Sequence, residues 1–321
     1  MSDPSRAGAR PFFRTLGRTG LTVSAFGLGG GTGISSADAL YAYDRGVNFF
    51  FYSADLHHFR YGNMAEALRR LCGTSSSERS KIVLAAVTYI NRPHLLTGVL
   101  FDQIQELGID YIDVLFWGYI CDQDRRTLKD CLDYTRIVRG PNAALARYAE
   151  QAHGASENLK KFGIVRYVGA SFHSVDVARE WVSHDALDVM MHRYNVAHRA
   201  AAPLFDALGS PDGGRQGIVT FKTMCGTKGP LWHAPAGYAV GAPLPDPATL
   251  YRYPLSHPSV DVCLAAWENR REIDQAFDAA ALGPLCAEDI RYLEQYGDLH
   301  AGRTPIGGAG GPTARPSAVM V

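Results

Sequence analysis

Short apolar runs alternate with amphipathic segments along most of the chain. The apolar runs are bounded by glycine or charged residues, which is typical of strands buried in a parallel sheet. Helical periodicity follows several of them, as at Ala37–Arg45, Gly62–Leu71 and Leu95–Leu107, and a further helix is expected to end at 161–163. Eight such units predict a closed (β/α)8 TIM barrel rather than an open sheet. The expected strands are Ala25–Gly29, Asn48–Phe51, Ile82–Val87, Tyr111–Trp117, Tyr167–Ala170, Val189–Tyr194, Ile218–Lys222 and Asp261–Leu264.

The two ends of the chain differ from this pattern. Residues 1–11 form a polar leader, and 302–321 form a tail rich in glycine and proline, so we expect both to be flexible. Residues 12–301 form the predicted barrel domain. It opens with an expected β-hairpin cap, made by Phe12–Leu16 and Leu21–Val23.

Two loops are longer than a simple barrel needs. They run from Cys121 to about His153 and from Met224 to about Pro247, after the expected fourth and seventh strands. Both leave the carboxyl ends of strands, where barrel enzymes place their active sites. They are interpreted either as lids and substrate walls or as surface insertions.

Composition narrows the possible partners. The 321-residue chain has 32 basic and 32 acidic side chains, so its formal net charge is zero and gives no reason to expect nucleic acid or an anionic membrane. Its six cysteines form no C-x-x-C pair, which favours a reducing compartment. No signal peptide and no apolar run of the roughly 18 residues needed for a membrane span is visible. We expect a soluble cytoplasmic protein that acts on a small molecule, with its oligomeric state left open.

A polar loop follows the expected second strand. It carries Asp55, His57, His58 and Tyr61, next to Arg60. Either histidine could act as a general acid or base near pH 7. A metal site is disfavoured because adjacent histidines point apart in an extended loop and no third ligand is evident. The alternative is a polar surface loop.

Other candidates lie at the ends of later strands. Lys222 is a candidate for Schiff-base or proton-transfer chemistry, or else it points outward. His173 and Tyr194 are expected near the mouth of the barrel, with Trp117 and Tyr119 as an aromatic wall. Satisfied core polar groups and simple packing are the alternatives for these four.

Several segments resemble aldo-keto reductases, in the order in which that family has them. The first is FRTLGRTGLTVSAFGLG at 13–29, which resembles the family's hairpin and first strand. The others are GVNFF at 46–50, LGIDYIDV at 107–114, GIVRYVGAS at 163–171, RYNVAHR at 193–199 and LSHPSVDV at 255–262. The resemblance implies the same barrel and an NADP(H)-dependent reduction of carbonyl compounds by a tetrad of Asp, Tyr, Lys and His.

The tetrad positions are where the resemblance fails. The positions of Asp, Lys and His align with Phe51, Val87 and Gly118, and Tyr61 is the candidate for Tyr. A phenol has a pKa of about 10 and is a poor proton donor near neutrality without a cation beside it. The chain therefore resembles a divergent branch of the family, with Phe51 as part of a rebuilt substrate pocket.

The cofactor contacts implied by the resemblance are also altered. Ser171 and Asn195 are the candidates for holding a nicotinamide. Arg270 and Arg271 could hold a phosphate at the start of a helix, or else they are solvated. Other family positions are replaced: Met191, Thr223, Ala266 and Glu268. NADP(H) is a possible cofactor on this evidence.

Three functions follow from these patterns. The first is an NADP(H)-dependent oxidoreductase with non-standard catalytic residues, such as Tyr61, His57 or His58. The second is a non-redox cyclase, isomerase or lyase that uses Asp55, the histidines or Lys222. The third is a catalytically silent cofactor-binding protein. The barrel itself does not decide among them.

Overall fold

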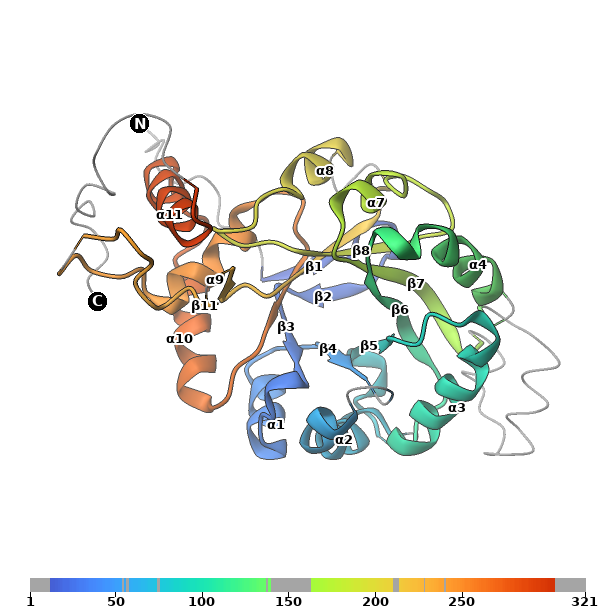
Figure 1. Cartoon of the computed structure of the whole chain (residues 1–321). Helices are drawn as coiled ribbons and strands as arrows, with labels where there is room; N and C mark the ends of the chain where they lie inside the picture. Colours follow the sequence, from blue (N-terminus) through green and yellow to red (C-terminus); the bar gives the residue numbers. More distant parts are fainter. Residues whose placement is uncertain are drawn as a thin grey trace, which may run out of the picture.

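The computed structural model in Figure 1 contains a closed barrel of eight parallel strands in the order β12-β3-β4-β5-β6-β7-β8-β9. The predicted (β/α)8 fold is confirmed. The structure describes residues 12–53, 55, 58–73, 76–136, 138–139, 163–209, 214–227, 229–239 and 241–303. The predicted leader, nearly all of the predicted tail, the helix expected to end at 161–163 and the second half of the first long loop lie outside these residues.

The barrel strands follow the predicted apolar runs, with ends shifted by a few residues. They are β3 (Phe26–Gly29), β4 (Phe49–Tyr52), β5 (Val83–Thr88), β6 (Ile112–Ile120), β7 (Val165–Phe172), β8 (Val189–Arg193), β9 (Gly217–Phe221) and β12 (Val262–Ala265). Two antiparallel hairpins lie outside the barrel: β1 (Phe13–Thr15) with β2 (Thr22–Ser24), and β10 (Cys225–Gly226) with β11 (Gly229–Pro230).

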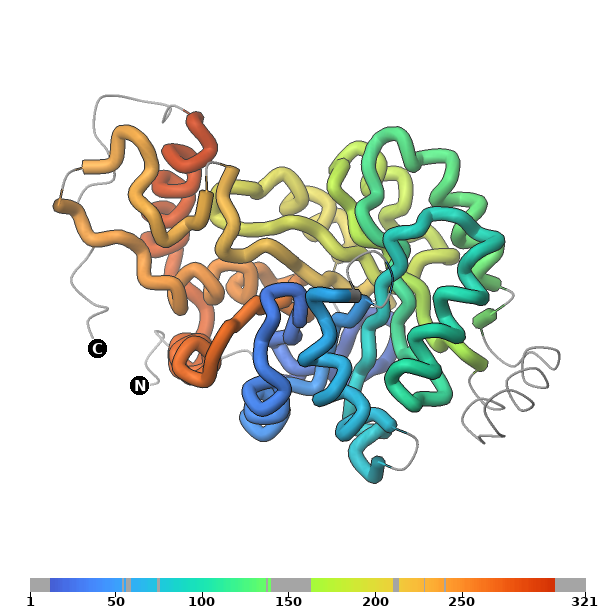
Figure 2. Tube along the Cα trace, turned by 60° about the horizontal axis from the view of Figure 1, so that its bottom comes forward, coloured from blue at the N-terminus to red at the C-terminus, as the bar shows by residue number. Residues whose placement is uncertain are grey.

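Helices surround the strands, and successive segments follow one another around the molecule (Figures 1 and 2). They are α1 (Ser36–Asp44), α2 (His58–Cys72), α3 (Leu96–Leu107), α4 (Arg125–Thr135), α7 (Val175–Arg179), α8 (Ala202–Ala207), α9 (Pro247–Ser256), α10 (Arg270–Ala281) and α11 (Ala287–His300). Short 3-10 turns are η1 (Gly17–Thr19), η2 (Gly30–Thr32), η3 (Arg79–Lys81), η4 (Pro93–Leu95) and η5 (Asp122–Asp124).

Local chemistry fixes several helix ends. The Ser35 side chain accepts a hydrogen bond from the Asp38 backbone N–H at the start of α1, and Asn269 does the same for Glu272 at the start of α10. Helix α3 stops at Gly108, whose φ of 63° lies in the left-handed region that favours glycine. One predicted helix start was wrong by just over one turn, because α2 begins at His58 rather than at Gly62.

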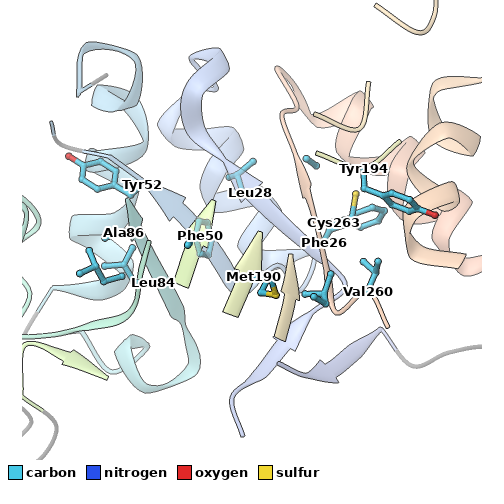
Figure 3. Close-up of a cluster of buried hydrophobic side chains, with 14 of the residues drawn as sticks. Phe26, Leu28, Phe50, Tyr52, Leu84, Ala86, Met190, Tyr194, Val260 and Cys263 are labelled. Carbon is cyan, nitrogen blue, oxygen red and sulfur yellow. The ribbon is translucent and has the colours of Figure 1, made fainter. Parts of the chain in front are cut away.

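Side chains alternate between two cores along each strand. Outward-facing side chains such as Phe26, Phe50 and Met190 pack under the helices, and Figure 3 shows this cluster. Inward-facing side chains such as Phe49, Val114 and Val262 fill the lumen together with Leu16, Leu21 and Val23 from the hairpin region. The period of two is the expected geometry of a barrel strand. The lumen is thus a packed core whose amino-terminal end the β1–β2 hairpin covers.

Buried aspartates join neighbouring strands in pairs. Asp113, Asp188 and Asp261 each accept the backbone N–H of a residue on the preceding barrel strand. Each carboxylate also pairs with arginine, and the most buried pair joins Arg215 to Asp261 at 2.6 Å. Each buried charge is therefore paired with an opposite one, as burial requires.

Candidate functional site

Phe51, Val87 and Gly118, which the sequence resemblance aligned with Asp, Lys and His, lie on β4, β5 and β6. Phe51 and Val87 belong to the apolar lumen cluster. The ring centroids of Phe51 and Phe116 lie 6.0 Å apart. Gly118 follows on β6. These three positions therefore supply packing surface and space, and no proton chemistry.

The space at Gly118 is occupied by Tyr89. A Cβ atom at position 118 would lie 2.6 Å from Cδ1 of Tyr89 and 2.8 Å from Cγ2 of Val87. No side chain fits at this position unless both the Tyr89 ring and the Val87 side chain move. Tyr89 directly follows β5, packs against the lumen cluster and is partly exposed. The Tyr89 ring, from the neighbouring strand, therefore occupies the space beside Gly118.

Tyr89 is part of a hydrogen-bonded group with Tyr61 and Asp55. The Tyr61 and Tyr89 hydroxyls are hydrogen-bonded to each other. The Asp55 carboxylate accepts the Tyr89 backbone N–H at 2.7 Å and the Ser53 hydroxyl at 2.8 Å. Two phenols and a carboxylate, contributed by α2, by the end of β5 and by the segment after β4, therefore meet at the mouth.

Both phenols are protonated at neutral pH, and burial makes each a weaker acid than a free phenol. Burial raises the pKa of Tyr61 far above its usual value, and burial followed by the Asp55 charge raises the pKa of Tyr89 to about 12. The hydrogen bond from Tyr61 acts in the opposite direction and lowers the Tyr89 pKa. Arg60 is the one cation among the causes that shift the Tyr61 pKa, and its contribution is the smallest. The group is suited to donating hydrogen bonds rather than to acting as a base at pH 7, and only the hydrogen bond from Tyr61 makes Tyr89 a stronger acid.

The opposite wall of the mouth is aromatic and basic. The rings of Tyr119 and His173 stack with centroids 4.0 Å apart, and His173 lies 5.2 Å from Phe221. Burial, together with the charges of Lys222 and Arg193, lowers the pKa of His173 to about 4, so its imidazole is neutral at pH 7. Tyr119 is 55% exposed and has a φ of 58°, which is uncommon for a residue with a side chain.

The structure corrects two predicted pocket residues. Trp117 faces the helices, is fully buried and donates its indole N–H to the Thr135 hydroxyl on α4. Tyr194 is one of the outward-facing side chains in Figure 3, and its ring stacks on Tyr253 of α9 at 5.6 Å. Both predictions failed because strand alternation, not proximity to a strand end, decides which side chains enter the lumen.

The predicted catalytic residues are dispersed. Asp55 and Tyr61 lie together as described, and Tyr61 is on α2 rather than in a loop. Lys222 is exposed after β9, which β12 and β3 separate from β4, and it has a φ of 57°. His57 and the side chain of His58 lie outside the described residues.

The predicted cofactor contacts are only partly available. Ser171 is buried at the end of β7, on the lumen-facing side of the alternation. The Asn195 side chain is fully engaged: its Nδ2 donates to two carbonyls, and its Oδ1 accepts from Ala197 and His198. It has no group left for a nicotinamide amide.

The predicted phosphate contacts are also altered. Arg270 pairs with Asp38 at 3.0 Å, and Arg271 is exposed on α10. A cavity of about 420 Å³ lies beside η2 and the start of α2, and Glu268 lines it where the resemblance implies an arginine. The residues present do not fit NADP(H) in the manner that the resemblance implies.

Neither a metal site nor a membrane-spanning helix is found in the described part of the chain. Within it, no group of three or more His, Cys, Asp or Glu side chains is placed to hold a metal ion. None of its helices combines the length and apolar character needed to cross a membrane.

Sequence reasoning missed Tyr89, Arg193 and His198 as parts of the mouth. Tyr89 lies two residues after Val87, so the alternation already placed it on the lumen side. The contact of Arg193 with His198 depends on how the chain folds back after β8, which no local pattern reveals.

Comparisons with known proteins agree with this architecture. No family model matches the chain, and no curated protein matches it by sequence. Aldo-keto reductase AKR11C1 from Bacillus halodurans, in its holo form, is 16% identical with a TM-score of 0.63, over 92% of this chain and 98% of that one. A putative aldo-keto reductase from Pseudomonas aeruginosa is 18% identical with a TM-score of 0.59, over 84% and 95%. A thermostable aldo-keto reductase in complex with the inhibitor epalrestat is 15% identical with a TM-score of 0.59, over 88% and 99%. The chain therefore has the fold of the aldo-keto reductases.

Proposed function

We propose that this chain is an aldo-keto-reductase-like enzyme that acts on the carbonyl group of a small molecule at the barrel mouth, with Tyr89 as the proton donor. The observation that carries the proposal is the pair of hydrogen-bonded phenols, Tyr61 and Tyr89, in the space left by Gly118. The site lies at the carboxyl ends of the strands, where barrel enzymes bind their substrates.

The two phenols have different roles in the proposed reaction. A carbonyl oxygen that enters the mouth accepts a hydrogen bond from the Tyr89 hydroxyl. Tyr61 donates to the Tyr89 oxygen and so stabilises the negative charge that grows there as the proton moves to the substrate. Asp55 holds the Tyr89 backbone in place. The low polarity of Phe51 and Val87 strengthens these interactions by excluding water.

The first form of the proposal is an oxidoreductase that uses NADP(H). Its support is the fold of the solved reductases and the lumen-facing Ser171. The non-standard residues are then Tyr89, Tyr61 and Asp55.

The second form is a non-redox enzyme, such as an isomerase or lyase, that needs only proton transfer next to a carbonyl. This form is favoured because the side chains of Asn195 and Arg270, both candidate cofactor contacts, already bind groups within the protein. Tyr89 then polarises the carbonyl oxygen, and a second group must take the proton from carbon. His57 and His58 stay candidates for that base.

A titration of the purified chain with NADPH, followed by nicotinamide fluorescence, separates the two forms. Saturable binding, with oxidation of the cofactor by an aldehyde panel, is the result expected of the oxidoreductase. No binding at millimolar cofactor would exclude it and leave the non-redox form. Binding without turnover across the panel would contradict both forms and indicate a silent cofactor-binding protein.

A further inference from the structure

Two cations at the mouth have no carboxylate to neutralise them. Arg193 ends β8 on the lumen-facing side of the alternation and is in register with Phe221, and Lys222 follows Phe221 directly. Among the described residues, neither side chain lies within ion-pair distance of an acid. Burial and the Arg193 charge together lower the pKa of Lys222. The two like charges stand at the ends of neighbouring strands and repel each other, and an anion bound between them would relieve this repulsion.

Arg193 is positioned by a neutral group. Its Nη1 lies 3.3 Å from Nε2 of His198, and Nδ1 of His198 lies 3.2 Å from Oδ1 of Asn195. Because Asn195 Oδ1 can only accept, Nδ1 carries the proton and Nε2 accepts from Arg193. Burial and the Arg193 charge lower the pKa of His198 to about 4, so this arrangement holds at neutral pH. His198 therefore orients the Arg193 guanidinium without neutralising its positive charge.

Lys222 is fixed by the same asparagine. The Nδ2 of Asn195 donates to the Lys222 carbonyl at 2.7 Å and to the Cys225 carbonyl at 3.0 Å. These bonds hold Lys222 at a φ of 57°, a strained conformation for a lysine. Asn195 is buried and uses its whole side chain on the backbone and His198 beneath the two cations. Asn195 therefore positions both cations, Lys222 directly and Arg193 through His198.

The wall beside the cations is aromatic. Tyr119, stacked on His173, and Phe221 offer ring faces next to Arg193 and Lys222. Tyr119 is also in the left-handed region, so backbone strain occurs on both sides of the patch. Such strain is concentrated at ligand sites more often than elsewhere.

We propose that Arg193 and Lys222 form an anion-binding site at the mouth, and that its ligand is a small planar molecule carrying a carboxylate or phosphate. The aromatic wall stacks on the plane, and the guanidinium binds the oxyanion. The binding site stands independently of the catalysis proposed above, whereas its role as the substrate anchor rests on that proposal.

Calorimetric titration of the full chain tests the site, with ionic strength held constant by NaCl. The probes are benzoate, phenyl phosphate and the neutral benzamide. We expect saturable binding of at least one anion and none of benzamide, and the tighter anion identifies the preferred group. Arg193→Met should weaken binding roughly 10- to 100-fold, as expected for the loss of a charge-assisted hydrogen bond. Lys222→Met, an exposed position that folding should tolerate, should weaken it less.

Arg126→Met on α4 is the matched control, because Arg126 is also an exposed cation and lies outside the mouth. Equal losses in the Arg126 and Arg193 variants, or no saturable binding of either anion by the wild type, would overturn the proposal. Tyr89→Phe should bind the anion like the wild type. The anion site and the proposed catalysis can therefore fail separately.

Discussion

At the residue scale, Gly118 makes room for the Tyr89 side chain at the mouth. The absence of a Cβ atom at Gly118 lets the Tyr89 ring enter the lumen beside Val87. The sequence indicated that an acid–base residue was missing at this position. It did not indicate the replacement, because the Tyr89 ring reaches the site from the neighbouring strand. The relation between Gly118 and Tyr89 becomes visible only when β5 and β6 lie side by side.

His192 makes the stability of the fold depend on pH. Its imidazole is buried between Phe172 and Phe205, its Nε2 has no hydrogen-bond partner, and burial lowers its pKa to about 3. A histidine with a lowered folded-state pKa contributes stability above its unfolded value, near 6.5, and loses it as pH falls towards 3. His192→Leu removes this loss.

Urea denaturation at pH 7 and pH 4.5 measures the effect. Relative to the wild type, the leucine variant should gain roughly 2–3 kcal/mol of unfolding free energy between the two pH values, at about 1.4 kcal/mol per pH unit. His184, which is exposed, serves as the control position. The same pH dependence in wild type and variant would show that His192 is not the titrating group.

At the element scale, the strands are joined by buried aspartates as well as by the sheet. Arg215 and Asp261 form two hydrogen bonds between the starts of β9 and β12, and Asp261 also accepts the Ile218 N–H. Breaking a buried pair by removing one charge is far more costly than losing a surface pair, because the other charge stays buried.

Asp261→Asn should therefore lower the unfolding free energy by about 3–5 kcal/mol. Chemical denaturation checks this value against Asp133→Asn, which removes the partner of Lys129 on the exposed face of α4 and should cost about 0–1 kcal/mol. Similar losses at the two positions would mean that the Arg215–Asp261 pair contributes no more than a surface ion pair.

At the scale of the whole molecule, the sequence predicted the barrel far better than the site. Apolar runs such as Ile82–Val87 report burial directly, so all eight strands were found in order. The site depends on which face of each strand meets the lumen and on contacts between distant segments. That is why Trp117 and Tyr194 were misplaced and the link from Asn195 through His198 to Arg193 went unseen.

The central claim is that the Tyr89 hydroxyl supplies the proton at this mouth. Its most direct test compares the wild type with Tyr89→Phe and with Tyr43→Phe, a phenol on α1 bonded to Glu78 outside the barrel. Turnover would be followed over a carbonyl panel by NADPH oxidation and by deuterium exchange next to the carbonyl, which together cover both forms of the proposed reaction. We expect Tyr89→Phe to lose turnover by roughly 10²-fold or more, Tyr43→Phe to keep the wild-type turnover, and both variants to be folded. Wild-type turnover by Tyr89→Phe, or neither reaction in the wild type, would contradict this claim.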